Sequence, residues 1–230
     1  MKINVFLPCK KNSKRIKNKN KRKFANINFG LVKIKLSQLL KSKLIDNIYL
    51  STNDNEIIKF AQKLRKKKLI IHKRKDTFLS RDNTMTQSLI NHAYNIIPDG
   101  HILWTHVTSP FVNEKIYDDV IKLYKKILKL KKYDSLMSIT KIKGFVWDDK
   151  KSINYNSKKV KWPKTQDIKP LNKINSGIFL SSRLNYLKFK NRIGKKPFMY
   201  ELPRFLGADI DDAEDFYLAE FLYKNKNKYR

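Results

Sequence analysis

The chain has 230 residues, of which 41% are hydrophobic and 12% aromatic, so it is long and apolar enough to bury the core of one domain. No apolar run approaches the roughly 20 residues of a membrane span, and the apolar stretch near Met1 is too short for a signal peptide, so we expect no membrane partner. The formal net charge is +32, and most of it comes from lysines that are spread along the whole chain. Because the charge is spread and carried by lysine rather than arginine, we expect no specific nucleic-acid partner. Cys9 is the only cysteine, so no internal disulfide forms, and we expect a cytoplasmic protein.

Short apolar runs alternate with longer stretches in which apolar residues recur at helical spacing, a pattern typical of βαβ units. In chain order, the pattern predicts strands over 3–9, 47–54, 68–74, 101–111, 134–150 and 174–182. It predicts helices over 29–45, 55–67, 84–97, 113–133 and 211–223. Asn113 is the expected N-cap of the fourth helix.

The segment over 145–175 is polar and rich in turn residues, and it interrupts the alternation of strands and helices. No internal repeat and no low-complexity linker divides the chain. We therefore predict a single α/β domain over 1–230, doubly wound around a mostly parallel sheet, with a small β-rich insertion at 145–175.

The segment that follows the first expected strand, in VFLPCKKNSKRIKNKN, turns from apolar to densely basic. Ligands of doubly wound sheets bind outside the carboxyl ends of the strands, and this loop lies there. Asn12, Ser13 and the loop amides can donate hydrogen bonds to phosphate oxygens. The cations that can neutralise phosphate charge are Lys10, Lys14, Arg15 and Lys19. The chain has neither a P-loop nor a dinucleotide fingerprint, and on charge alone a solvated basic loop would explain the same residues.

Near the C-terminus, GADIDDAEDF carries closely spaced carboxylates. In extended chain, residues two apart project to the same side, so Asp209 and Asp211 would form a pair while Ile210 points into the core. Carboxylates on one face suit Mg²⁺, which binds carboxylates, water and substrate phosphates. The same cluster would also cap and charge the start of the last helix, and we expect both roles, with Asp212 and its neighbours serving the helix.

The stretch LPCKKNSKRIKNKN resembles the N-terminal signature of the CMP-sialic acid (acylneuraminate) cytidylyltransferase family. The positions that match the signature are Ser13, Lys14, Arg15, Lys19 and Asn20. Lys10 stands where the family has an arginine that contacts phosphate, and Lys11 and Asn12 replace its two glycines. Lysine keeps the charge of arginine but lacks its planar fork.

Two further segments resemble the same family. In HVTSPF, Thr108 and Ser109 would line the sugar and phosphate side, and His106 stands where many relatives carry glutamine and would touch the sugar. In LSRDNTMTQSL, Arg81 and Asp82 would face the nucleotide. Residue 84 or 86, each a threonine, would cap the helix that follows.

The segment WPKTQDIKPLNKINSGIFL is similar to a sugar-recognition segment in one branch of the family. By that resemblance, Gln166 and Asn175 would bond the acid sugar, and Lys164 is positioned in the sequence to meet a carboxylate. The excursion over 145–175 resembles the arm that pairs subunits, which implies a homodimer.

The resemblance runs along nearly the whole chain and implies a Rossmann-like nucleotidyltransferase fold. The implied reaction transfers a cytidylyl group from CTP to the anomeric hydroxyl of an acidic 3-deoxy-2-keto sugar and releases pyrophosphate. Lys10 and Lys19 would act at the phosphates, while Asp209 and Asp211 would hold Mg²⁺ as the cofactor. These four residues are the predicted catalytic set.

Three alternatives remain open from the sequence. The first is a basic nucleic-acid-binding protein, which would bind with a steep salt dependence and no turnover of CTP. The second is a nucleotidyltransferase of another acceptor specificity. The third is a low-activity paralogue, which is suggested by Lys10, Lys11 and Asn12. Within the main hypothesis the acceptor is also open among sialic, legionaminic, pseudaminic and 3-deoxyoctulosonic acids.

Overall fold

The computed structural model describes residues 1–75 and 85–226 of the chain. In this part, seven strands form one sheet in the order β3-β2-β1-β4-β6-β5-β7. The strands are β1 Ile3–Cys9, β2 Asn47–Thr52, β3 Leu69–Lys73, β4 His101–Trp104, β5 Ser135–Ile142, β6 Leu171–Ser182 and β7 Pro197–Glu201. The helices are α1 Gly30–Lys41, α2 Asn55–Lys63, α3 Thr86–Ile96, α4 Glu114–Lys129, α5 Arg183–Phe189 and α6 Ala213–Lys224, with a 3₁₀ turn, η2, at Thr165–Asp167.

The sheet is mostly parallel, as predicted. Strand β1 pairs in parallel with both β2 and β4, β2 pairs in parallel with β3, and β5 pairs in parallel with β7. Strand β6 alone runs against its neighbours β4 and β5. The chain winds outward from β1 to β3 and then returns to β4 on the other side of β1. The carboxyl ends of β1 and β4 therefore form the switch point at which doubly wound sheets bind ligands.

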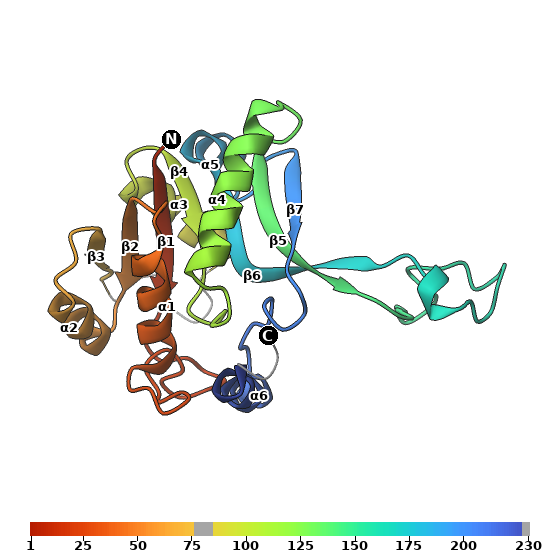
Figure 1. The fold of residues 1–230 in the computed structure, drawn as a ribbon, viewed down its shortest axis with the longest axis horizontal. Coiled ribbons are helices and arrows are strands. Elements are labelled where there is room, and N and C mark those ends of the chain that lie inside the picture. Colours follow the sequence, from red (N-terminus) through yellow and green to blue (C-terminus); the bar gives the residue numbers. More distant parts are fainter. Residues whose placement is uncertain (76–84, 227–230) are drawn as a thin grey trace.

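Helices cover both faces of the sheet (Figure 1). Helices α1 and α4 lie on the near face in that view, α3 and α5 lie on the far face, and α6 lies below the carboxyl ends of the parallel strands. The larger buried cluster joins the sheet to α1, α2, α4 and α6, and the smaller one joins it to α3 and α5. Helix α4 shows why the sequence pattern works, because Tyr117, Val120, Ile121, Tyr124 and Ile127 recur at helical spacing and are all buried.

The predicted helix starts are confirmed at α4 and not at α3. The side chain of Asn113 accepts a hydrogen bond of 3.1 Å from the backbone N–H of Ile116, as an N-cap does. Helix α3 has Met85 at its N-cap position, Thr86 as its first residue, and no side-chain cap. The prediction for Thr86 was therefore wrong, because that residue already lies inside the helix, while residue 84 lies outside the described residues.

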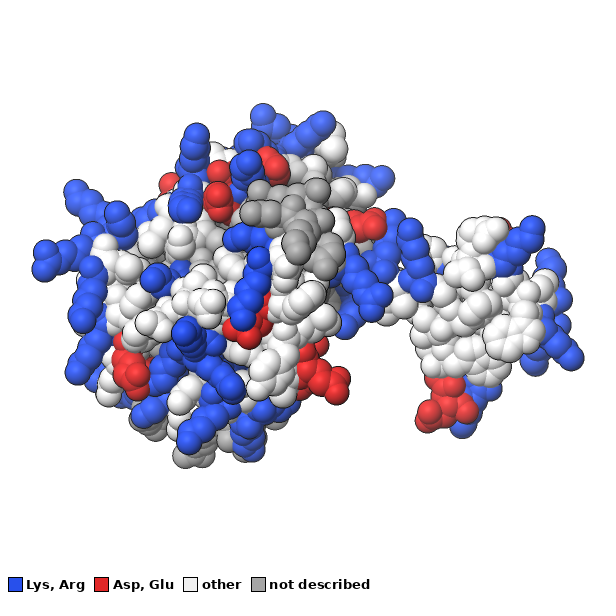
Figure 2. Space-filling model, turned by 60° about the horizontal axis from the view of Figure 1, so that its bottom comes forward, with Lys and Arg blue, Asp and Glu red and all other residues white. Residues whose placement is uncertain are grey.

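The excursion predicted for 145–175 exists, but its secondary structure differs from the prediction. Strands β5 and β6 leave the sheet as a two-stranded ribbon and stay paired as far as Ile142 and Leu171. The segment 143–170 at its far end holds one isolated bridge, between Trp147 and Ser152, and the turn η2, so the end of the arm is irregular rather than β-rich. Figure 2 shows the arm as a second lobe joined to the body by a narrower connection.

Two elements, α5 and β7, lie in a stretch to which the sequence pattern assigned no element. The fourth strand is shorter than predicted and ends at Trp104, because the chain turns at the residues that follow it. Among the described residues, no helix combines the length and apolarity that crossing a bilayer requires.

Candidate active site

The basic loop that follows β1 lies at the switch point and is fixed by side-chain amides. The backbone N–H of Lys11 donates to Oδ1 of Asn53 at 2.8 Å, and Nδ2 of Asn20 donates to the carbonyl of Lys10 at 2.8 Å. Asn12 has a φ of 57°, in the left-handed region. Asparagine tolerates this conformation better than most residues, so it supplies the turn for which the family uses glycine. In this loop Ser13 is half-buried and Lys14 is exposed.

Lys19 joins this loop to the aspartate segment near the C-terminus. Its side chain is almost fully buried, and Nζ donates to the carbonyl of Ile210 at 2.6 Å and to that of Asp211 at 3.5 Å. Burial lowers the pKa of Lys19, and the charges of Asp211 and Asp209 oppose that change. The two ends of the chain therefore converge, as predicted, although the Lys19 ammonium itself lies on backbone carbonyls.

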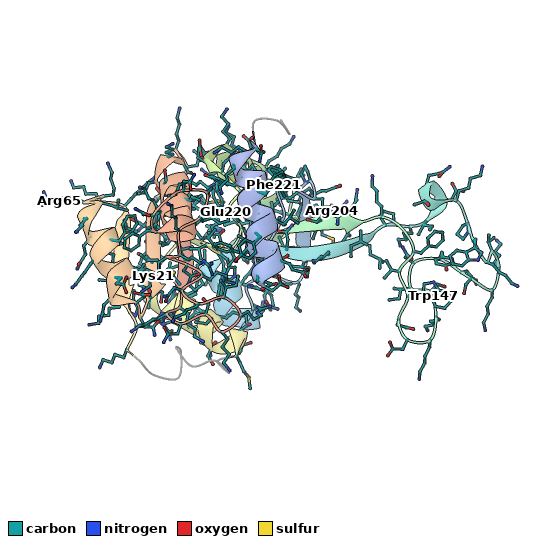
Figure 3. The ribbon with its side chains drawn as sticks, turned by 90° about the horizontal axis from the view of Figure 1, so that it is seen from below. Lys21, Arg65, Trp147, Arg204, Glu220 and Phe221 are labelled. Atoms are coloured by element: carbon teal, nitrogen blue, oxygen red, sulfur yellow. The ribbon has the colours of Figure 1, made fainter. Side chains whose placement is uncertain are left out.

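The aspartate segment is also joined to the loop after β4. Ile210 is fully buried, as its predicted inward orientation requires, and its backbone N–H donates to the carbonyl of Thr108 at 3.0 Å. Beyond it, Asp212 caps α6 by accepting from the N–H of Asp215 at 3.0 Å, and the Asp215 carboxylate accepts in return from the N–H of Asp212 at 3.3 Å. This capping box confirms the helix role expected for the acids after Asp211. Figure 3, viewed from this edge, shows α6 beside α1, with Lys21 of the basic loop at the same side of the sheet.

The two predicted metal ligands are in different states. Asp211 is exposed, and its Oδ1 pairs with the guanidinium of Arg15 at 2.9 Å. Asp209 is half-buried, and in the described part of the chain its Oδ1 is buried without a hydrogen-bond partner. A buried carboxylate oxygen without a donor is costly, and a cation would satisfy it.

This pair fits Mg²⁺ bound together with substrate, and does not fit a metal held by protein alone. Over residues 1–75 and 85–226, no group of three or more His, Cys, Asp or Glu side chains gathers to hold a metal. Mg²⁺ often uses one or two carboxylates and takes its other ligands from water and substrate phosphates.

A buried lysine that the sequence analysis missed shapes the loop after β4. Lys35 of α1 is fully buried, and Nζ donates to the carbonyls of Ser109 at 2.8 Å and Val112 at 3.0 Å and to the hydroxyl of Tyr117 at 2.8 Å. Burial lowers the pKa of Lys35 well below its usual value. Nearby, Nε2 of Gln38 donates to the carbonyl of Pro110 at 2.6 Å. The signal in the sequence was a lysine among the apolar positions of the helix.

His106 is held in the neutral form. Nε1 of Trp104 donates to Nε2 of His106 at 2.8 Å, so the ring proton resides on Nδ1. Burial lowers the pKa of His106 to about 3, and the charges of Arg192 and Lys19 act in the same direction. His106 therefore contributes a hydrogen-bond donor, and no charge, at neutral pH. Ser109 is buried, with a hydroxyl that has no partner among the described residues.

A second missed residue, Arg74, lies at the carboxyl end of β3. It is 4% exposed, and its backbone N–H donates to the carbonyl of Thr52 at the end of β2. Burial lowers the pKa of its guanidinium. A buried arginine at the ligand-binding edge is a candidate nucleotide contact. The predicted nucleotide contacts Arg81 and Asp82 lie outside the described residues.

The predicted sugar-binding residues do not gather at one place. Lys164 and Gln166 are exposed on the segment 143–170 at the far end of the arm, away from the switch point (Figure 1). Asn175 is buried in β6, where Oδ1 accepts from Ser138 at 2.5 Å and Nδ2 donates to Thr140 at 2.9 Å. Its amide is thus already engaged within the sheet.

Comparisons with known proteins match nearly the whole chain. Residues 5–228 match the family model described as Cytidylyltransferase. The chain is 24% identical to an N-acylneuraminate cytidylyltransferase of Escherichia coli over the whole chain, although it spans only 54% of that protein. It is also 24% identical to a pseudaminic acid cytidylyltransferase of Campylobacter jejuni, over 97% of both chains. A solved structure of CMP:2-keto-3-deoxy-manno-octonic acid synthetase complexed with CTP aligns with a TM-score of 0.65 at 13% identity, over 98% of this chain and 100% of that one.

The neutral state of His106 predicts a pH-dependent stability. Its pKa is lowered from 6.5 to about 3 in the folded chain, so between these values the unfolded chain binds a proton that the folded chain does not. The folded state should therefore lose up to about 2 kcal/mol from this group between pH 7 and pH 5. The variant His106→Gln keeps an acceptor for Trp104. In this variant the difference between the free energies of unfolding in urea at pH 7 and pH 5 should be smaller than in the wild type by that amount. An unchanged difference would contradict the assignment.

Proposed function

The chain belongs to the cytidylyltransferase family, and we propose that it transfers a cytidylyl group from CTP to the anomeric hydroxyl of an acidic 3-deoxy-2-keto sugar, releasing pyrophosphate. The observation that carries the proposal is the contact of Lys19 with the carbonyls of Ile210 and Asp211, which brings the basic loop and the paired carboxylates to one edge of the sheet. The relatives that act on acylneuraminate and pseudaminic acid support an acidic sugar as the acceptor.

The basic loop is the proposed phosphate site. Lys10 and Lys19 bring positive charge to the triphosphate, and Ser13 and the loop amides donate hydrogen bonds to its oxygens. The remaining proposed nucleotide contacts are Asn12, Lys14, Asn20, Arg81 and Asp82. Arg74, buried at the neighbouring strand end, joins them. Fixing the phosphates against the acceptor hydroxyl lowers the barrier, because it supplies the alignment that two free reactants lack.

Asp209 and Asp211 are the proposed ligands of Mg²⁺. The metal, when bound, neutralises phosphate charge and lowers the pKa of a coordinated hydroxyl or water. Arg15 pairs with Asp211 in an exposed contact, which is worth little free energy, so the carboxylate can exchange this partner. Thr108, Ser109 and His106 line the acceptor side of the switch point in this proposal.

The arm is proposed to pair two subunits. Aromatic side chains cluster at its far end, where the ring centroids of Phe145 and Trp162 lie 5.2 Å apart and Trp162 is 74% exposed. A two-stranded ribbon with an exposed aromatic end gains stability when another surface covers it. Lys164 and Gln166 lie on this segment, so in a homodimer they would serve the sugar site of the second subunit. The buried, unpaired Cys9 suits a reducing cytoplasm, which is the proposed compartment.

The proposed reaction is tested by incubating the protein with CTP, Mg²⁺ and a panel of sialic, legionaminic, pseudaminic and 3-deoxyoctulosonic acids. We expect release of pyrophosphate and formation of a CMP-sugar with at least one of them. The control reaction contains EDTA. If none of the acids is consumed while CTP binding is retained, the acceptor proposal is overturned.

Replacing either metal ligand should abolish turnover and leave the fold intact. In Asp209→Asn and Asp211→Asn, Mg²⁺-dependent pyrophosphate release should fall at least about 100-fold, because the phosphates lose a bound cation. Asp212→Asn is the matched control, since it removes a neighbouring carboxylate while asparagine still caps α6. Near-normal rates in both ligand variants, with circular dichroism unchanged in all three proteins, would refute the metal assignment.

Subunit pairing through the arm predicts a change of mass in solution. The double variant Trp147→Ser, Trp162→Ser should sediment as a monomer at concentrations at which the wild-type chain sediments as a dimer. Phe221→Ser is the matched control, because Phe221 is an equally exposed aromatic residue on α6, far from the arm (Figure 3). A wild-type monomer, or a double variant that stays dimeric, would exclude this interface.

A further inference from the structure

Arg192, in the loop between α5 and β7, is held on an aromatic surface at the end of β4. Its guanidinium carbon lies 3.8 Å from the ring centroid of Phe179 and 5.4 Å from that of Trp104. Phe179 and Trp104 are directly opposite each other on β6 and β4, so both rings lie on the same face of the sheet. Stacking on two rings fixes the plane of the guanidinium before any ligand arrives.

This guanidinium has no counter-charge within the part of the chain that the structure describes. Arg192 is half-buried, and over residues 1–75 and 85–226 it makes no ion pair and donates no hydrogen bond. Burial lowers its pKa, but an arginine stays protonated at any physiological pH. A partly buried guanidinium that makes no internal hydrogen bond or ion pair can bind an incoming anion without first giving up a protein contact.

Arg192 belongs to the same region as the proposed acceptor side of the site. Trp104, on whose ring it lies, donates to His106 through Nε1. The charge of Arg192 also helps to lower the pKa of His106. Fully buried Tyr186, which interacts electrostatically with Arg192, also has a hydroxyl without a partner among the described residues.

We propose that Arg192 binds the carboxylate of the acidic acceptor through its two-pronged guanidinium, and so supplies acid specificity from the same subunit that holds the aspartate pair. The inference rests on the proposed function and names the contact that distinguishes an acidic sugar from a neutral one. A planar fork matches both oxygens of a carboxylate, which the point charge of a lysine does not. Lys164, the residue expected from the sequence to meet a carboxylate, lies on the arm and not in this region.

The test compares Arg192→Met and Arg192→Lys with the wild type, using the panel acid that turns over fastest and the carboxamide of the same sugar. In Arg192→Met, kcat/KM for the acid should fall about 100-fold through a higher KM for the sugar, while KM for CTP stays unchanged. Arg192→Lys should recover part of the loss. The carboxamide should be a poor substrate of the wild type, because it lacks the carboxylate that Arg192 would bind. Its kcat/KM should therefore fall little further in Arg192→Met.

Two further variants separate this role from a structural one. Lys195→Met removes an exposed lysine from the same loop, one that also lies over an aromatic ring, and it should leave all constants unchanged. Lys164→Met tests the arm lysine. The inference is overturned if Arg192→Met lowers kcat/KM equally for the acid and the carboxamide. It is also overturned if only Lys164→Met lowers kcat/KM for the acid more than for the carboxamide.

Failure of the proposed function gives a different result, since the wild type itself would then turn over no acid. In that case calorimetric titration of N-acetylneuraminic acid into the wild type and Arg192→Met still decides the inference. Weaker binding to the variant supports it, and equal binding or no binding to either protein overturns it.

Discussion

The site depends on one buried ammonium group. The side chain of Lys19 extends from the basic loop to the segment near the C-terminus and donates to the carbonyls of Ile210 and Asp211. Removing a lysine from water is unfavourable, and here carbonyl dipoles and two nearby aspartates offset the loss. Because Ile210 in turn donates to the carbonyl of Thr108, this single contact connects the segments after β1 and β4 with the segment before α6.

A second buried lysine stabilises the loop after β4. Lys35 gives all three of its protons to acceptors around the turn at Ser109 and Val112, so the loop after β4 is held from beneath by α1. Both lysines therefore act as connectors between backbone segments. Most of the remaining positive charge stands on the surface of the body and the arm, as the face in Figure 2 shows, with no single basic track. Such a distribution contributes to solubility more than to recognition of a particular polyanion.

The sequence pattern predicted those features that local chemistry decides. Strand β1 is apolar and buried, α4 has an apolar stripe and an asparagine cap, and α6 has an acidic capping box, so each could be read from neighbouring residues. The convergence of Lys19 with the aspartates was expected from the family resemblance, which implied that both act at the phosphates. The roles of Lys35, Arg74 and Arg192 were not, because each depends on partners far away in the chain. Of these three, in a chain with 52 lysines and arginines, only Lys35 carries a local signal of burial, which is its place among the apolar positions of a helix. Elements α5 and β7 were missed because their apolar residues follow no clear period.

Charged groups near His106 help to keep its ring neutral in the proposed site. The charges of Arg192 and Lys19 lower the pKa of His106, and the charge of Asp211 acts against them. In the proposed reaction two anions approach each other, the triphosphate and the acid sugar. An imidazole that gained a proton here would add a further cation between them. Burial and the flanking cations instead keep the ring neutral, and Trp104 fixes which nitrogen holds the proton. In the proposed reaction each anion would meet its own cation, and the neutral ring would contribute orientation without charge. Such a separation is what a reaction between two anionic substrates requires, because binding one must not weaken the site for the other.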